Sequence, residues 1–437
     1  MCVKVLMFGW EFPPYFAGGV GIVCYELAKQ LVSEGIDLEY VMPYCPDTVD
    51  PDFMDVFNTK KRVLKYADKT PQTQVKITRV KSLLCAYQTQ EEYERTLEQV
   101  GQADLGLDDA DDDGADNTLK LYGEDLLDEI GRFSKRTALL CENGEFGDVD
   151  VIHAHDWTTV PAAIVAKRIT GKPLIVHCHI TEVNKNAGKG VNQEVYDIER
   201  SGFFAADIII SVSNGIKQTL VDQYGVSPEK IRVVHNGGVS MEPVKTRVSE
   251  FKGDNRIVSF MGRITGMKGP ENFIRMAEKV LMHCSNVKFV MAGSGDKLQA
   301  CIDLTKELGI YDKFYFHGFY SRKEANFFFD LSDVFLLPSL MEPFGVTPLE
   351  AMQKETPVIV SKQSGVSEVL NHCFKVDFWD VDKMASQVIA LLKYTPLHKT
   401  MTFNGVEEAK NINWKAPAQK CIQVYNELVD SRHARMR

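Results

Sequence analysis

Two series of short apolar runs, separated by stretches with helical periodicity, constrain the fold of this chain more than any other feature. The first series comprises residues 4–9, 150–155, 173–179, 207–213 and 231–237, and the second comprises residues 256–262, 288–293, 313–318, 333–338 and 357–361. Strands that alternate with helices form parallel sheets that helices cover on both faces. We therefore predict an α/β protein that contains two parallel sheets.

The length of the chain favours two domains, because 437 residues exceed what one hydrophobic core normally serves. We predict a first domain over residues 1–240 and a second over residues 241–412, with the polar stretch 239–255 as the linker. The helical pattern of residues 413–437 follows the second sheet, and from its pattern alone it could pack on either domain.

Residues 88–140 do not follow the alternation of apolar runs and helical stretches in the first domain. This segment is charged and includes the acidic run 104–116. Within it, "DADDDG" at 109–114 fits the first half of a calcium loop, but Lys120 occupies the twelfth position, where a bidentate Glu belongs. We therefore interpret the acidic run as part of a solvated insertion without a metal.

The composition excludes several classes of function. A net charge of −10 argues against nucleic acid as a main partner, since phosphate backbones need a basic surface. The ten cysteines form no CxxC pair and no zinc spacing, which indicates a reducing compartment. No run approaches 18 apolar residues, so we predict a cytoplasmic chain without membrane insertion. The oligomeric state is not readable from the sequence.

The stretch "PSLMEPFGVTPLEAM" at 338–352 places two acids, Glu342 and Glu350, around a turn between a predicted strand and a predicted helix. Glu350 has a structural alternative, because Thr347 as N-cap, Pro348 and Glu350 together fit a capping box. Glu342 follows an apolar strand and should face the crevice in which open parallel sheets bind ligands.

The loop "MGRITGMKGPENF" at 261–273 leaves a predicted strand and enters a helix that starts with Pro270. Its two cations, Arg263 and Lys268, suggest a diphosphate site, because Arg offers bidentate donors and Lys offers a point charge. The alternative is that both are solvated surface cations.

Two further strand ends carry marked residues. Gly18 and Gly19 precede a helical pattern, whose N-terminus would suit a phosphate, although a plain glycine turn explains them equally well. In "HAHDW", His153 and His155 share one face of a strand, so one could be a core histidine while the other reaches the crevice. A metal site would need a third ligand that the local sequence lacks, so we predict none.

The triplets "DVD" at 148–150 and 380–382 raise the question of a metal-binding DxD motif. Neither follows a strand, since the first precedes a predicted strand and the second falls where a helix starts. We reject this interpretation.

Taken together, "AGGVG", "HAHDW", "MGRITGMKG", "MAGSGD" and "MEPFGVTPLEAM" resemble the retaining glycosyltransferases of family four, and most closely their glycogen and starch synthase branch. The resemblance covers nearly the whole chain. It implies the GT-B fold, with two Rossmann-like domains that face each other across a cleft and a last helix that crosses back to the first domain.

The resemblance also implies roles for particular residues. Arg263 and Lys268 would bind the donor diphosphate and stabilise it as the leaving group, while Glu350 would hold the ribose. Glu342 would contact the donor sugar, and His155 would orient that sugar. The implied donor-binding residues are Gly18, Gly19, Gly295, Phe344, Gly345, Val346, Thr347 and Glu350.

The implied activity is metal-independent transfer of glucose from ADP-glucose or UDP-glucose to the non-reducing end of an α-1,4-glucan, without a cofactor. Bacterial enzymes that use ADP-glucose typically carry a lysine before the first Gly-Gly, whereas this chain has Ala17, so the donor nucleotide stays open. The alternatives are a sucrose-type, trehalose-type or surface-glycan hexosyltransferase and, from a different class, a catalytically silent nucleotide-sugar or glucan-binding protein.

Overall fold

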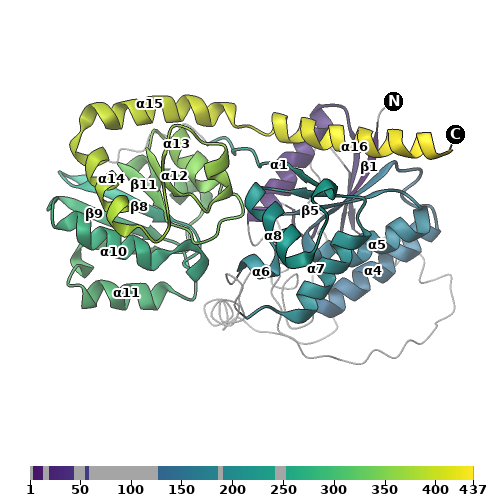
Figure 1. Cartoon of the computed structure of the whole chain (residues 1–437), viewed down its shortest axis with the longest axis horizontal. Helices are drawn as coiled ribbons and strands as arrows, with labels where there is room; N and C mark the ends of the chain where they lie inside the picture. The colour runs from purple at the N-terminus through teal and green to yellow at the C-terminus, as the bar shows by residue number, and fades with distance from the viewer. Residues whose placement is uncertain are drawn as a thin grey trace.

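The computed structural model describes residues 3–12, 19–43, 55–58, 126–185, 190–241 and 252–436. Gly18, Ala17 and the acidic run 104–116 lie outside these described residues. The described part folds into two parallel sheets with helices on their faces, which confirms the predicted α/β class (Figure 1).

The first sheet lies in the N-terminal half, and every strand pairs in parallel with its neighbours. Among the described residues its spatial order is β3 (Asp55–Asn58), β2 (Asp37–Met42), β1 (Lys4–Phe8), β4 (Val151–His155), β5 (Leu174–Cys178), β6 (Ile208–Ser211) and β7 (Ile231–Val233). Strands β1, β4 and β5 are central and almost wholly buried, which explains their continuous apolar text.

Helices cover both faces of this sheet. One face carries α1 (Gly19–Ser33) and α16 (Lys415–Met436), which pack on each other. The other face carries α4 (Leu126–Glu142), α5 (Asp156–Thr170), α7 (Gln193–Ala205) and α8 (Asn214–Tyr224), with the short α6 (Glu182–Lys185) beside them.

Part of the segment that the sequence analysis assigned to the insertion forms α4. Leu126, Ile130, Phe133 and Leu140 recur on one side of this helix and are buried, and α4 packs along α5. Their spacing follows the helical period, so the charged residues between them face outward. Residues 126–140 therefore belong to the core of the first domain.

The second sheet lies in the C-terminal half and is also parallel. Its described strands, in spatial order, are β10 (Phe314–Gly318), β9 (Val287–Ala292), β8 (Arg256–Met261), β11 (Val334–Leu337), β12 (Val358–Ser361) and β13 (Phe374–Val376). The helices are α10 (Pro270–Leu281), α11 (Leu298–Glu307), α12 (Arg322–Leu331), α13 (Thr347–Gln353), α14 (Val381–Lys393) and α15 (Thr395–Asn411). Helix α10 packs on α11 and α14, and α13 packs on α15.

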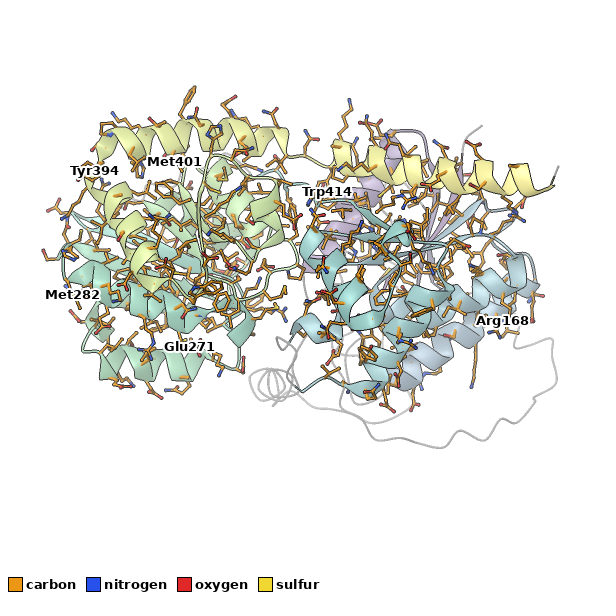
Figure 2. All side chains as sticks on the ribbon, viewed as in Figure 1. Arg168, Glu271, Met282, Tyr394, Met401 and Trp414 are labelled. Carbon is orange, nitrogen blue, oxygen red and sulfur yellow. The ribbon has the colours of Figure 1, made fainter. Side chains whose placement is uncertain are left out.

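The chain returns from the second domain to the first between α15 and α16 (Figures 1 and 2). The Gly238 amide donates to the Ile412 carbonyl at 2.8 Å. A Cβ atom on Gly237 would lie 2.7 Å from the Trp414 nitrogen, so this crossing needs glycine. Trp414 is buried at the junction, and α16 then runs along α1 and β4. None of the described helices is long and apolar enough to cross a membrane.

Candidate functional site

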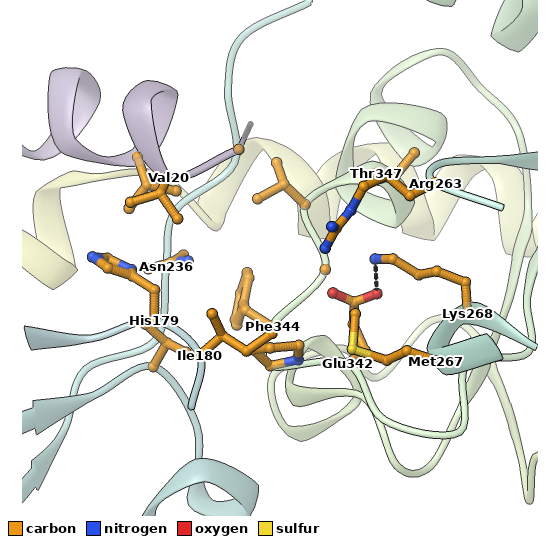
Figure 3. Close-up of a pocket in the computed structure, with 16 residues that line it drawn as sticks. Val20, His179, Ile180, Asn236, Arg263, Met267, Lys268, Glu342, Phe344 and Thr347 are labelled. Atoms are coloured by element: carbon orange, nitrogen blue, oxygen red, sulfur yellow. Dashed lines mark hydrogen bonds and ion pairs between the residues drawn. The ribbon is translucent and has the colours of Figure 1, made fainter. Parts of the chain in front are cut away.

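A cleft of about 260 Å³ lies between the two domains, at the carboxyl ends of their strands (Figure 3). The first domain lines it with Gly19, Val20, Val23, His179, Ile180, Val212 and Asn236, and the second with Arg263, Met267, Lys268, Glu342, Pro343, Phe344, Gly345, Val346 and Thr347. The volume is slightly below the ~300–1,000 Å³ typical of small-molecule sites.

The two predicted cations, Arg263 and Lys268, both line the second-domain wall. Lys268 ends the short 3-10 helix η3 (Gly266–Lys268), and Gly269 follows it with φ of 67°. A Cβ atom on Gly269 would lie only 2.2 Å from the Pro338 carbonyl oxygen. Glycine therefore allows this turn to close on the loop that follows β11, which brings Lys268 to that loop.

Lys268 and Glu342 form an ion pair inside the cleft, drawn as a dashed line in Figure 3. The Glu342 side chain is 7% exposed and its Oε2 atom also lies 3.4 Å from the Ser339 hydroxyl. The Glu342 carbonyl accepts from the Gly365 amide at 2.9 Å, which fixes the backbone of the acid. Lys268, which we predict to bind the diphosphate, and Glu342, which we predict to contact the sugar, are thus direct neighbours.

The turn that follows Glu342 requires glycine at Gly345. Its φ is 92°, and a Cβ atom there would approach Glu342 Cγ to 2.9 Å. Phe344, Gly345, Val346 and Thr347 all line the cleft. Their binding to a donor stays a prediction.

Helix α13 shows that the capping-box alternative for Glu350 is wrong. Val346 is the N-cap, Thr347 is already helical, and no side chain caps the helix. The reason is that the Val346 carbonyl itself accepts from the Leu349 and Glu350 amides, so Thr347 falls one position too late.

Glu350 does not line the described cleft. Burial raises the pKa of its carboxyl, and the nearby charge of Arg322 opposes that increase. Burial also raises the pKa of the Tyr320 hydroxyl, with Glu350 as a further cause. The second acid therefore sits beside the loop between β10 and α12, in a different environment from the first.

The histidine that lines the cleft is His179, which follows β5, and not His155 of β4. His155 is 1% exposed and does not line the cavity, whereas His179, which follows β5, is 5% exposed and does. His155 Nδ1 lies 2.9 Å from His179 Nε2, so it reaches the cleft through that ring. His153 is a core histidine, with Nδ1 2.7 Å from the Tyr425 hydroxyl of α16. The sequence analysis missed His179. The motif "HCH" at 177–179, which ends the next apolar run and repeats the alternation of "HAH", could have indicated it.

The predicted glycines are placed as follows. Gly19 begins α1 and lines the cleft, while Gly18 lies outside the described residues. Gly295 does not line the cleft. Its φ is 155°, and a Cβ atom there would lie 2.3 Å from the Ile264 carbonyl oxygen, so the close approach of the two backbones requires glycine. It supports the loop that carries Arg263.

Glu368 joins the two domains beside the cleft, and the sequence analysis did not identify it. Its carboxylate accepts from the Asn214 amide at 3.0 Å and the Gly215 amide at 3.2 Å, at the start of α8, and lies 2.7 Å from His235 Nε2. Partial burial acts to raise the pKa of Glu368, but the hydrogen bonds from His235 and Asn214 outweigh it and lower that pKa.

The arrangement offers two cations and one carboxylate in a cleft between two α/β domains. Positive groups that are already oriented can bind a diphosphate and stabilise the charge that develops as it leaves. The neighbouring acid can stabilise positive charge on a reacting sugar.

Two family models match parts of this chain. Residues 242–407 match the family model "Glycosyl transferases group 1", and residues 125–237 match the model "Glycosyltransferase Family 4". Each match falls on one of the two domains.

Several curated proteins are similar along much of the chain. An uncharacterized glycosyltransferase of Methanocaldococcus jannaschii is 28% identical over 382 residues, which are 85% of this chain and 83% of that protein. A glycogen synthase of Mycobacterium tuberculosis is 22% identical over 84% of this chain and 80% of its own length. A D-inositol 3-phosphate glycosyltransferase of Kribbella flavida is 26% identical over 66% of this chain and 74% of its own length.

The fold is shared with solved structures of the same kind. Anabaena HepE, in complex with UDP and glucose, aligns over 98% of this chain and 100% of its own with a TM-score of 0.64 and 16% identity. Two parallel-sheet domains, the two family matches and these relatives together identify the chain as a GT-B glycosyltransferase of family four.

Proposed function

We propose that this chain is a retaining hexosyltransferase that moves glucose from a nucleoside diphosphate glucose to the non-reducing end of an α-1,4-glucan. The observation that carries the proposal is the group formed by Arg263, Lys268 and Glu342 on one wall of the interdomain cleft. A glycogen synthase among the relatives that span most of the chain supports the glucan acceptor.

The donor is proposed from the charges in the cleft. Arg263 and Lys268 bind the diphosphate and stabilise it as it leaves, which replaces the electrostatic role of a divalent cation. The complex of HepE with UDP and glucose supports a nucleotide-linked glucose donor for a chain of this fold. The reaction then needs no cofactor.

Glu342 is proposed to change partners during the reaction. In the free cleft its carboxylate pairs with Lys268. A bound diphosphate attracts the Lys268 ammonium, which leaves the carboxylate next to the donor sugar. There it stabilises the oxocarbenium-like transition state.

A small phosphorylated acceptor is the second candidate, because D-inositol 3-phosphate glycosyltransferases also occur among the similar proteins. The two candidates share the donor site and differ only in the acceptor.

The test is an acceptor and donor panel with the purified full chain. ADP-glucose, UDP-glucose and GDP-mannose are each supplied without acceptor, with glycogen and with D-inositol 3-phosphate, while nucleotide release and product size are measured. We expect glycogen-dependent nucleotide release from one glucose donor, longer glucan chains and an α-linked product by NMR.

The controls separate this activity from a contaminant. Lys268→Ala should lose the activity. Lys279→Ala should keep it, because Lys279 of α10 forms only an exposed ion pair with Asp382 of α14. Release that depends on D-inositol 3-phosphate would replace the glucan acceptor. Donor binding without release from any pair would favour the catalytically silent alternative.

A further inference from the structure

A short 3-10 helix of the second domain, η5 (Gly365–Glu368), contacts both the cleft loop and the first domain. It follows β12 and lies beside the loop that carries Glu342. The proposed glucosyl transfer needs the Glu342 carboxylate in place, and η5 is bonded to the backbone of that residue.

The start of η5 holds the backbone of the cleft loop. The Gly365 amide donates to the Glu342 carbonyl at 2.9 Å, and the Val366 amide donates to the Phe344 carbonyl at 2.7 Å. A Cβ atom on Gly365 would overlap the Pro343 carbonyl oxygen, so glycine allows the two segments to lie this close. A shift of η5 would therefore move the backbone of Glu342 and Phe344.

The end of η5 caps helix α8 of the first domain. The Glu368 carboxylate accepts from the Asn214 and Gly215 amides, which are the first two N–H groups of α8. The Asn214 side-chain Nδ2 donates to the same carboxylate at 2.7 Å. The first N–H groups of a helix have no acceptor within the helix and carry partial positive charge, so a carboxylate from outside binds them well.

Two further contacts bring the first domain to the cleft loop at the same place. A Cβ atom on Gly365 would lie 2.8 Å from Ser213 Cβ, at the N-cap of α8. His235, whose Nε2 lies 2.7 Å from the Glu368 carboxylate, has its ring centroid 6.2 Å from that of Phe344. Phe344 in turn lines the cleft. The start of α8 and His235 thus contact the segment that holds Glu342.

We propose that Glu368 is a positioning residue that makes the placement of Glu342 depend on the contact between the two domains. While Glu368 caps α8, η5 is fixed at both ends and holds the Glu342 carbonyl. If the domains separate, the carboxylate loses its first-domain partners and η5 is held by the second domain alone. Glu342 is then correctly placed only when the first-domain wall of the cleft is also in place. This role rests on the proposed function, in which Glu342 acts on the donor sugar.

Glu408 of α15 offers a matched control within a single domain. Its carboxylate accepts from the Asn371 amide at 2.7 Å, from the His372 amide at 2.8 Å and from the Asn371 side chain at 3.0 Å. Glu368 makes the same kind of contact, with two successive backbone amides and one asparagine side chain, but its partners lie in the other domain. Neither acid is among the residues that line the cleft.

The test compares Glu368→Ala with Glu408→Ala in the full chain by steady-state kinetics, calorimetric donor binding and hydrogen exchange of backbone amides. Glu368→Ala should lower kcat by roughly 10²-fold, the loss that a small misplacement of a reacting group causes, with little change in donor affinity. It should also speed exchange at Gly365 and Val366, whose amides bond the cleft loop. Glu408→Ala should keep the wild-type kcat and speed exchange only at Asn371 and His372.

Glu368→Gln is a milder second variant. It keeps one acceptor oxygen for the α8 amides and loses the charge, so its kcat and exchange rates should lie between those of Glu368→Ala and the wild-type chain.

Two outcomes would overturn the proposal. Faster exchange confined to Asn214 and Gly215, with wild-type kcat, would mean that Glu368 only caps α8. A lower kcat without faster exchange at Gly365 and Val366 would mean that the effect does not pass through η5. If the wild-type chain transfers sugar to no acceptor, the proposed function fails, and the exchange rates at Gly365 and Val366 alone then decide whether the domain contact is coupled to the cleft loop.

Discussion

Lys268→Ala tests the ion pair in the cleft, because it removes one member of a pair that is nearly excluded from solvent. The side chains of Lys268 and Glu342 are 14% and 7% exposed. Without the ammonium, the carboxylate keeps only a long contact of 3.4 Å with the Ser339 hydroxyl among its described side-chain hydrogen bonds. The substitution should therefore destabilise the chain as well as slow the reaction.

The size of the loss follows from the position of the pair. Removing one partner of a fully buried ion pair costs about 3–5 kcal/mol, whereas leaving a polar group unsatisfied costs about 1–3 kcal/mol. Because the pair lines a cleft that water can enter, we expect a loss of roughly 2–3 kcal/mol in the free energy of unfolding.

A second substitution separates stability from catalysis. Adding Glu342→Gln to Lys268→Ala removes the unpaired charge and should recover about 1–2 kcal/mol. Turnover should stay low, since Lys268→Ala alone lowers it by roughly 10²–10³ through loss of an oriented positive group.

Urea denaturation and steady-state kinetics of the two single variants and the double variant measure both effects. Lys279→Ala, at an exposed pair, serves as the matched control and should change neither quantity much. Additive stability losses in the double variant would show that the two charges are not coupled. Wild-type turnover of Lys268→Ala at saturating donor would refute the diphosphate role.

Four further predictions concern other groups. Glu342→Gln should lower kcat strongly with little change in donor affinity, whereas Glu350→Gln should raise KM more than it lowers kcat; the reverse pattern in kinetics and calorimetry would exchange the two roles. Activity should persist in EDTA, because Arg263 and Lys268 supply the positive charge. Loss of activity in EDTA and its recovery on addition of magnesium would contradict this prediction. Burial raises the pKa of Glu199 to about 8 from the ordinary 4.5, so the unfolded chain loses this proton first and stability should fall as pH rises from 4.5 to 8. The slope should be up to about 1 kcal/mol per pH unit, and Glu199→Gln should flatten it in urea titrations. Glu368→Ala should loosen the domain contact and raise proteolytic susceptibility in the absence of donor, and unchanged cleavage would mean that the contact is dispensable.

The positions of the strands could be predicted from sequence because apolar runs report burial directly. The run at 333–338 became β11, Val334–Leu337, and the run at 150–155 became β4, Val151–His155. Both strands are central in their sheets and have helices on both faces, so the pattern left few alternatives.

The contacts within the site were harder to predict because the order of strands in space differs from their order in the chain. Lys268 follows β8 and Glu342 follows β11, which are adjacent strands although the residues are 74 positions apart. The sequence placed both near the cleft, but only the sheet order pairs them. His179 was not predicted for a similar reason. Strand β5 lies beside β4, so the His179 ring that follows β5 lies between His155 and the cleft.

The two domains are also in direct contact beside the cleft. A Cβ atom on Gly365 would lie 2.8 Å from Ser213 Cβ, so the two domains meet closely at this glycine, and Glu368 reinforces the contact at the start of α8. The cavity behind it is about 260 Å³, and Lys268 and Glu342 neutralise each other there. An unpaired charge would be costly in so small a space. In the proposed reaction, a donor diphosphate that takes Lys268 releases the carboxylate only when a sugar is beside it, so the pair keeps both charges in place at little cost until the substrate arrives.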